Sequence, residues 1–149
     1  MVKAGPDLTV HWRFLEEGDA ALHSWRCLYL WLEVDTDETL YLGIAGDCTV
    51  AERLRCRSKQ QVWARLNAQG RTGNCRVLVG EITLHTISRY SPELLLDIEG
   101  LLIREEIPRG NKQRLRGTWR PGLRVACAGA WPGSKRLYID SAVRSRRAA

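Results

Sequence analysis

One carboxylic acid lies in a sequence context where burying a charge is expensive. A helix around Glu99 places four apolar side chains on its face, one turn before it and one turn after it: Leu95, Leu96, Leu102 and Ile103. Burying an unpaired carboxylate costs several kcal/mol unless a metal ion, an arginine or a hydrogen-bond network compensates it. Glu99 is therefore either part of a reactive site or one half of a structural ion pair.

Positive charges are concentrated in two segments of the chain. The 149 residues carry 23 Lys and Arg against 17 Asp and Glu, a net charge of +6. Residues 1–40 hold three basic and eight acidic side chains, residues 53–76 hold seven basic and no acidic ones, and residues 104–149 hold twelve and three. This pattern favours a polyanion, nucleic acid above all, as partner. Alternatively, the 19 Arg and 4 Lys reflect genome composition and a merely soluble surface.

The composition fits one domain without a membrane span. Hydrophobic residues make up 44% and charged residues 27% of the chain, and no run of about 18 apolar residues is present. The five cysteines form no CxxC pair, which argues against a disulfide framework or a zinc cage. We therefore expect a single domain over residues 1–149 that is cytoplasmic and has reduced thiols.

Hydrophobic periodicity predicts the elements that position these side chains. Alternation indicates a strand over Arg26–Val34 and a second over Thr39–Leu42, joined as an antiparallel hairpin. A helical pattern then begins at Thr49, an N-cap with Glu52 three residues later, and ends at Gly70. Most of the positive charge of residues 53–76 lies on the exposed faces of this helix.

The second half of the chain predicts another strand, a long helix and two short strands. A strand covers Cys75–Thr86, and Ser91 followed by Pro92 begins a helix that reaches Ile107 and stops at Pro108. The other expected elements are strands over Leu123–Cys127 and Lys135–Asp140 and, in an ambiguous N-terminal region, a strand over Leu8–Phe14 and a helical turn over Asp19–Ser24. The prediction is an α/β (α+β) domain whose small central mixed or antiparallel sheet is flanked by α-helices.

Four short motifs occur in a fixed order along these elements. The two hairpin strands carry the triplets Cys27-Leu28-Tyr29 and Tyr41-Leu42-Gly43, and the next helix carries Arg53-Leu54. The long helix and its exit carry Glu99, Leu102-Ile103, Pro108 and, twelve residues after the glutamate, Asn111. In order and spacing these motifs resemble the GIY-YIG nuclease domain of excision-repair nucleases, homing endonucleases and some restriction enzymes. The resemblance covers roughly residues 27–111, with an extension at each end.

The resemblance implies a magnesium-dependent endonuclease that hydrolyses phosphodiester bonds in DNA. Glu99 would be the magnesium ligand, and Arg53, together with Arg57, would hold the scissile phosphate through a planar guanidinium. Tyr29 and Tyr41 would orient or deprotonate the attacking water, although tyrosines also pack in strands without a chemical role. The further nucleic-acid contacts expected are Arg55, Arg57, Lys59, Arg65 and Asn111, the last of which either reaches a phosphate or fixes local backbone.

Three positions depart from the family pattern and leave alternatives open. Cys27 replaces the first glycine, Ile44 stands where the repair enzymes have lysine, and Arg57 stands where histidine or tyrosine is common. One alternative is a catalytically inactive nucleic-acid-binding module with the same fold, and another is a protein-interaction domain with a basic tail. The short flanks also make a homodimer possible as a source of sequence preference. Six tryptophans either stack on single-stranded bases or fill the core: Trp12, Trp25, Trp31, Trp63, Trp119 and Trp131.

Overall fold

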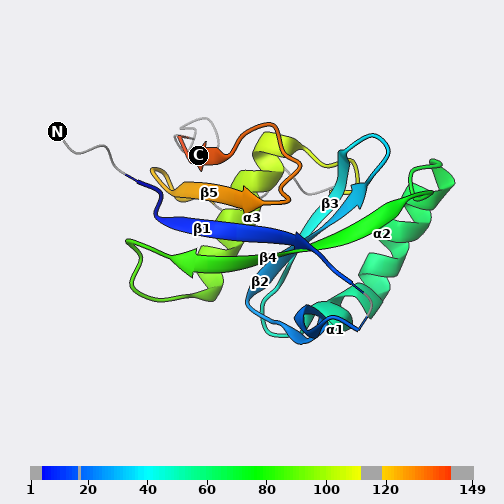
Figure 1. Ribbon diagram of the computed structural model, residues 1–149, viewed down its shortest axis with the longest axis horizontal. Helices are drawn as coiled ribbons and strands as arrows, with labels where there is room; N and C mark the ends of the chain where they lie inside the picture. The colour runs from blue at the N-terminus through cyan, green and yellow to red at the C-terminus, as the bar shows by residue number, and fades with distance from the viewer. Residues whose placement is uncertain (1–4, 17, 112–118, 142–149) are drawn as a thin grey trace, which may run out of the picture.

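A computed structural model describes residues 5–16, 18–111 and 119–141, which form a six-stranded mixed sheet with helices (Figure 1). The strands are β1 (Leu8–Phe14), β2 (Cys27–Glu33), β3 (Glu38–Ala45), β4 (Cys75–Leu84), β5 (Arg124–Gly129) and β6 (Leu137–Ile139). The helices are the 3-10 turn η1 (Ala20–His23) and the α-helices α1 (Val50–Arg55), α2 (Arg57–Ala68) and α3 (Pro92–Glu106). The predicted α+β class is confirmed.

The sheet runs in the order β3-β2-β4-β1-β5-β6. All neighbouring strands are antiparallel except β1 and β5, which are parallel, so the sheet is mixed. The predicted hairpin is β2–β3, and it sets Tyr29 opposite Gly43 and Trp31 opposite Tyr41. The strands outside the motif segment, β1, β5 and β6, lie beyond β4 and complete the same sheet.

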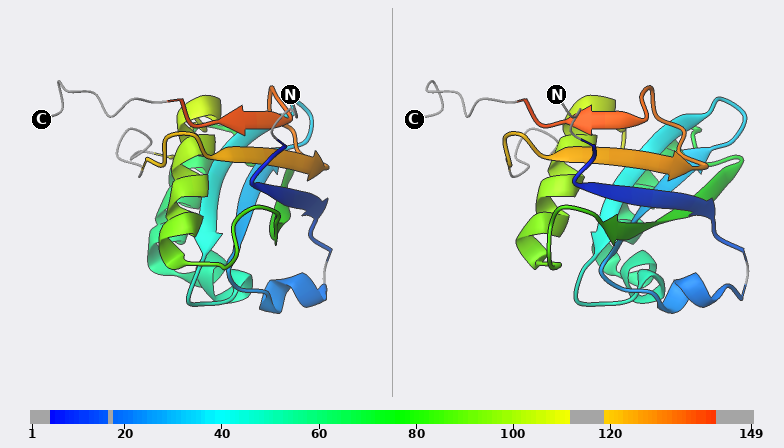
Figure 2. Two further views of the ribbon diagram at one scale, coloured as in Figure 1. Left: turned by 90° about the vertical axis from the view of Figure 1, so that its left-hand side faces the viewer. Right: turned by 60° about the vertical axis from the view of Figure 1, so that its left-hand side comes forward.

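The central strand β2 is buried on both faces. Its leucines, among them Leu28 and Leu30, belong to a core shared with α3, which Figure 2 shows running alongside the sheet. The alternate side chains Tyr29 and Trp31 belong to a second core with Leu66 of α2. Because successive side chains of a strand point to opposite faces, the hairpin carries its tyrosines away from the leucine core.

The helix predicted from Thr49 to Gly70 is two helices, so this prediction is wrong at its centre. The capping box of Thr49 and Glu52 is present, but α1 ends and α2 begins at Cys56, whose backbone is extended (φ −69°, ψ 153°). No glycine or proline marks the break, and the apolar pattern continues through it, so periodicity alone gives no signal. Several strand limits also differ from those expected: β3 continues to Ala45, β4 ends at Leu84, β5 covers Arg124–Gly129 and β6 is confined to Leu137–Ile139.

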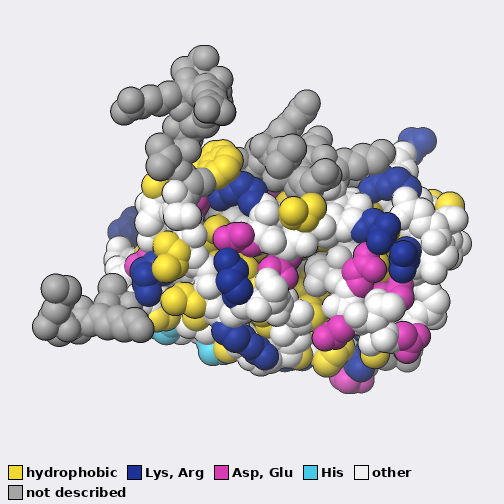
Figure 3. All heavy atoms as spheres, turned by 90° about the horizontal axis from the view of Figure 1, so that it is seen from above, with side chains coloured by type: hydrophobic (Ala, Val, Ile, Leu, Met, Phe, Trp, Pro, Cys, Tyr) yellow, Lys and Arg dark blue, Asp and Glu magenta, His cyan; other side chains and the backbone are white. Residues whose placement is uncertain are grey.

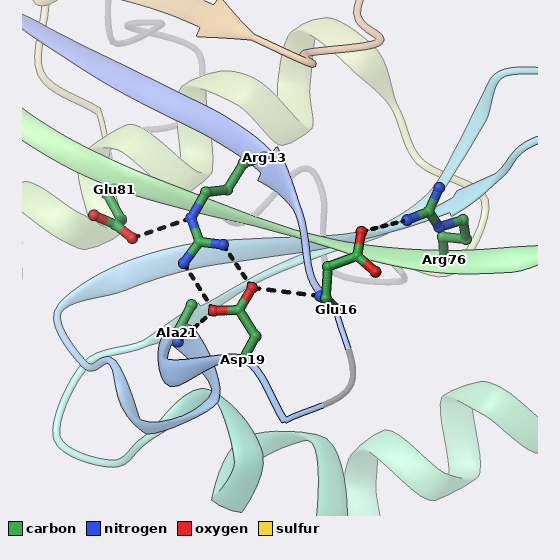
Figure 4. A network of polar contacts seen from close by, with 6 residues as sticks. All are labelled: Arg13, Glu16, Asp19, Ala21, Arg76 and Glu81. Atoms are coloured by element: carbon green, nitrogen blue, oxygen red, sulfur yellow. Dashed lines mark hydrogen bonds and ion pairs between the residues drawn. The ribbon is translucent and has the colours of Figure 1, made fainter.

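A network of polar contacts fixes η1 to the sheet (Figure 4). Arg13 of β1 donates two hydrogen bonds, of 2.6 and 3.0 Å, to the carboxylate of Asp19, which also accepts a 2.8 Å bond from the backbone of Ala21. The Arg13 guanidinium also lies 3.6 Å from Glu81 of β4. The hydrogen bonds from Arg13 hold the pKa of Asp19 well below its usual range. The segment that leads into β2 is thereby anchored before the motif begins.

No helix among the described residues is long and apolar enough to cross a membrane. On the face seen in Figure 3, positive and negative side chains are interspersed. Arg109 pairs with Glu38 at 2.9 Å and Lys135 with Glu105 at 3.2 Å, so part of the positive charge in the described chain is neutralised locally.

A methyl group added at Gly43 is expected to destabilise the hairpin. A Cβ there would lie 2.7 Å from both Cζ and Oη of Tyr29 and 2.9 Å from Cε1 of Tyr41. We expect Gly43→Ala to lower the free energy of unfolding by about 1–3 kcal/mol, because two buried rings must shift. Urea denaturation followed by circular dichroism measures it. Gly73→Ala is the control, since nothing lies within 4 Å of its Cβ, and equal effects of the two substitutions would contradict the prediction.

Candidate active site

The described structure brings Tyr29, Tyr41, Arg53 and Glu99 into one electrostatic neighbourhood. The rings of Tyr29 and Tyr41 lie on neighbouring strands with their centres 6.2 Å apart. The charge of Arg53 acts on both Tyr29 and Glu99, and the charge of Glu99 acts on Tyr29. Helix α3 carries Glu99 and contacts β2 and β3, while α1 brings Arg53 against the end of β3. The four predicted site residues are therefore linked through Tyr29, by a ring contact with Tyr41 and by the charges of Arg53 and Glu99, and their joint catalytic role stays a prediction.

Glu99 is a half-buried carboxylic acid without a direct partner. Within the described part of the chain, no hydrogen bond or ion pair reaches its carboxylate. Burial raises its pKa from an ordinary value of 4.5 to about 7, although the positive charges of Lys59 and Arg53 act in the opposite direction. Glu99 lies beside the buried stripe of α3 and not at its centre, because Leu96 on the same face is 40% exposed. Near neutral pH the side chain can therefore exchange a proton or take a cation.

Tyr29 is fully buried, and its hydroxyl has no hydrogen-bond partner in the described structure. Burial, reinforced by Tyr41, raises its pKa far above the ordinary value of 10, and Arg53 only partly opposes this effect. A tyrosine that deprotonates water must first lose its own proton, and here desolvation, the larger influence, opposes that loss. The group available at this position is a protonated hydroxyl that can donate one hydrogen bond.

Arg53 presents a guanidinium next to these groups. Its Nε donates a 3.1 Å hydrogen bond to the backbone oxygen of Ile44, immediately after the second triplet. Among the described residues, its two terminal nitrogens have no hydrogen-bond or ion-pair partner. A half-buried guanidinium held at one nitrogen leaves its other donors preorganised for a bidentate contact with a phosphate or carboxylate.

Lys59 lies closer to Tyr41 and Glu99 than sequence reasoning suggested. The sequence predicted Lys59 as a contact to the nucleic-acid backbone. In the structure its ammonium lies 4.9 Å from the ring centre of Tyr41, and its charge acts on Glu99. Tyr41 is 8% exposed and packs on Trp31, with ring centres 5.1 Å apart. Lys59 comes near Tyr41 because α2 packs against the hairpin, where Trp63 also lies with its ring centre 5.6 Å from that of Trp31.

The other predicted nucleic-acid contacts fall into two groups. Arg55 and Arg57 are exposed and available to a partner. Arg65 is half-buried and donates a 2.7 Å hydrogen bond to the backbone oxygen of Gly110. Asn111 is 8% exposed, and its amide pairs with both the N–H and the C=O of Leu42, at 2.9 and 2.8 Å. Asn111 was predicted either to reach a phosphate or to fix local backbone, and in the structure it fixes the backbone of Leu42.

A cavity of about 470 Å³ adjoins Arg53 and was not predicted from the sequence. Its walls include Trp25, Arg26, Ile44, Arg53, Tyr90 and Leu96. Three of these come from segments to which the motif gives no role, and they meet only in the folded chain. The available sequence signal was the Trp25-Arg26 pair itself, an aromatic and a cation side by side before the first triplet.

Neutralising Glu99 is expected to stabilise the protein in a pH-dependent way. Because the folded state binds this proton more tightly than the unfolded state, ionisation costs stability as the pH rises from 4.5 through about 7. We expect Glu99→Gln to be up to about 3 kcal/mol more stable than wild type at pH 8 and equal to it at pH 4. Urea denaturation at both pH values measures this, with the exposed Glu93→Gln as control. A pH-independent difference would contradict the assignment.

The described site thus combines one carboxylate, one guanidinium, one ammonium and two phenols. No cluster of three or more His, Cys, Asp and Glu side chains with the geometry of a metal site occurs among residues 5–16, 18–111 and 119–141. Comparison with protein-family models, curated proteins and solved structures gave no match to this chain.

Proposed function

We propose that this protein is a metal-dependent endonuclease of the GIY-YIG type that hydrolyses phosphodiester bonds in DNA. The observation that carries the proposal is the half-buried carboxylate of Glu99, which has no direct partner among the described residues. The charges of Arg53 and Glu99 both act on Tyr29, whose hydroxyl also lacks a partner among those residues. These side chains come from α3, α1 and β2, in the order and spacing that the family resemblance requires.

Phosphodiester hydrolysis needs an oriented water, relief of charge on the phosphoryl oxygens and stabilisation of the leaving oxygen. Arg53 supplies the second requirement, because its terminal nitrogens can contact two oxygens of one phosphate. Tyr29 keeps its proton and is fully buried, so its hydroxyl would donate a hydrogen bond to an oxygen of the reacting group only after the side chains that cover it shift. Tyr41 is the more accessible phenol and is suited to orienting the water.

The donor set around Glu99 fits magnesium as part of a ternary complex. Glu99 offers one carboxylate with no competing direct partner among the described residues, and magnesium commonly takes one or two carboxylates, several waters and substrate phosphate. When bound, magnesium supplies Lewis-acid stabilisation of charge on the phosphate and the leaving oxygen. Lys59 and Arg53 repel a free cation, so Glu99 is best suited to hold one when substrate phosphate is also present.

A catalytically inactive nucleic-acid-binding module is the alternative. It is favoured by the complete burial of Tyr29 and by Ile44, which stands where the repair enzymes of the family have a lysine. Arg55 and Arg57 would serve such a module equally well, because exposed cations contact the phosphate backbone without chemistry.

A plasmid-nicking assay separates the two functions. Supercoiled DNA is incubated with the protein in magnesium chloride and, in parallel, in EDTA, and the products are separated on an agarose gel. The proposal expects nicked or linear product in magnesium and none in EDTA. Binding of the DNA without cleavage in magnesium or manganese would favour the inactive module and overturn the proposal.

A further inference from the structure

The cavity beside Arg53 has the size and lining of a small-ligand site. Its volume of about 470 Å³ lies within the usual range of about 300–1,000 Å³ for such sites. Leu95, Leu96, Pro92 and Ile44 form its apolar part. Arg53, whose terminal nitrogens lack partners among the described residues, stands in its wall. The cavity and the proposed catalytic site therefore share one guanidinium.

The guanidinium of Arg26, packed against two aromatic rings, forms another wall of the cavity. The Arg26 guanidinium lies 4.3 Å from the ring centre of Trp25 and 5.0 Å from that of Tyr90. Trp25 is nevertheless 54% exposed, so much of its ring remains free for a further planar group. Aromatic rings and arginine planes are the surfaces on which unpaired bases stack.

The backbone holds this wall in an unusual conformation. Arg26 has a φ of +57°, a left-handed conformation that is uncommon for residues other than glycine. The chain just before Trp25 is anchored by η1 with its Asp19 cap and by the hydrogen bond of 3.0 Å from Val50 N–H to Ser24 C=O, and β2 begins directly after Arg26. The fold therefore fixes Trp25 and Arg26 at the cavity before any ligand arrives.

The charges at the cavity suit a nucleotide. Two guanidiniums, of Arg26 and Arg53, line it together with a single exposed carboxylate, Asp47. The guanidiniums can contact phosphate, and the carboxylate can accept hydrogen bonds from amino and imino groups on a base. One cavity thus combines a stacking face for a base, apolar walls against which a sugar can pack, and guanidiniums that can contact a phosphate.

We propose that this cavity binds an unpaired nucleobase of the DNA substrate, adjacent to the phosphate that Arg53 contacts. The proposal rests on the proposed function for its substrate, DNA, and extends it by naming the form of that substrate: single-stranded DNA or DNA with a locally opened pair. A paired base in a duplex is stacked on both neighbours and must leave the stack to enter a pocket. The protein therefore binds unpaired nucleotides in preference to duplex.

Fluorescence anisotropy in EDTA tests the proposal without any dependence on cleavage. The probes are a labelled single-stranded 12-mer and the duplex of the same sequence. We expect wild type to bind the single strand more tightly, and Trp25→Ala to weaken that binding about 10-fold, the usual effect of removing one stacking partner. The matched control is Trp63→Ala, because Trp63 is also exposed (41%) but lies on α2, where it packs against Trp31.

Arg26→Gly provides a second variant that does not threaten the fold. Glycine adopts the positive φ of Arg26 without strain, so the variant is expected to unfold at or above the wild-type urea concentration while it loses single-strand affinity. Equal losses from Trp25→Ala and Trp63→Ala, or equal losses for single strand and duplex, would overturn the proposal. If Trp25→Ala and Arg26→Gly weaken only single-strand binding but the protein never cleaves DNA, the nucleobase pocket stands and the proposed nuclease function fails. The failure of one proposal is therefore distinguishable from the failure of the other.

Discussion

Glu99→Gln is expected to reduce the rate of DNA nicking in magnesium about 1,000-fold or more. The amide is nearly the size of the carboxylate but carries no charge, so a hard cation loses its charged protein ligand. Among the described residues, the charges that act on this position are those of Lys59 and Arg53, and no second carboxylate is among them. A loss of several kcal/mol in transition-state stabilisation corresponds to this change in rate. The rate is measured from single-turnover nicking time courses on a plasmid.

The exposed Glu93→Gln is the control for Glu99, because it makes the same chemical change near the start of the same helix. It should retain wild-type nicking. Since Glu99→Gln is also expected to be more stable than wild type at pH 8, unfolding cannot account for lost activity. A Glu99→Gln protein that nicks DNA within 10-fold of wild type would remove Glu99 from the mechanism.

Arg53→Ala is expected to lower the cleavage rate about 100-fold or more while changing DNA affinity less than about 3-fold. One phosphate contact among many contributes little to overall binding, whereas a guanidinium on the scissile phosphate acts chiefly in the transition state. The hydrogen bond from Arg53 Nε to Ile44 fixes the guanidinium in advance, which favours such selectivity. Single-turnover rates in magnesium and anisotropy in EDTA measure the two quantities separately.

Arg55→Ala is the matched control for Arg53, because Arg55 is exposed two residues later on α1. It should weaken binding in a salt-dependent manner and leave the single-turnover rate nearly unchanged. Equal reductions of rate and affinity by Arg53→Ala would assign Arg53 to ordinary backbone binding.

Local sequence signals predicted most of the elements of this fold. Alternation located the β2–β3 hairpin, and the Ser91-Pro92 start and the Pro108 stop located α3, because strands and capped helices carry their signals within a few residues. The break at Cys56 was missed because no glycine or proline marks it and the apolar pattern continues through it. Strands β1 and β5 are parallel neighbours more than a hundred residues apart, a pairing that no local pattern specifies.

The sequence predicted which residues belong to the candidate site, but it did not predict how buried they are or which other side chains surround them. The motif resemblance selected Tyr29, Tyr41, Arg53 and Glu99, which the fold gathers. Their accessibility was not predictable, because Tyr29 is buried in a core assembled from distant segments, with Ala21 of η1, Val50 of α1 and Leu66 of α2. The wall of Trp25 and Tyr90 around Arg26 was also missed, since it joins segments more than sixty residues apart.

The double hydrogen bond between Asn111 and Leu42 has a consequence for self-association. Strand β3 is an outer strand of the sheet, and its backbone groups at Leu42 face away from β2 towards the chain that follows α3. The Asn111 amide imitates a peptide group, and Gly110 N–H bonds the C=O of Leu40 beside it. These bonds occupy the backbone groups of the β3 edge at Leu40 and Leu42, so a strand of another molecule cannot pair with them. Such pairing at exposed sheet edges is a common route to aggregation. Asn111 thus protects the protein against aggregation through this edge as well as holding the chain after α3 against β3.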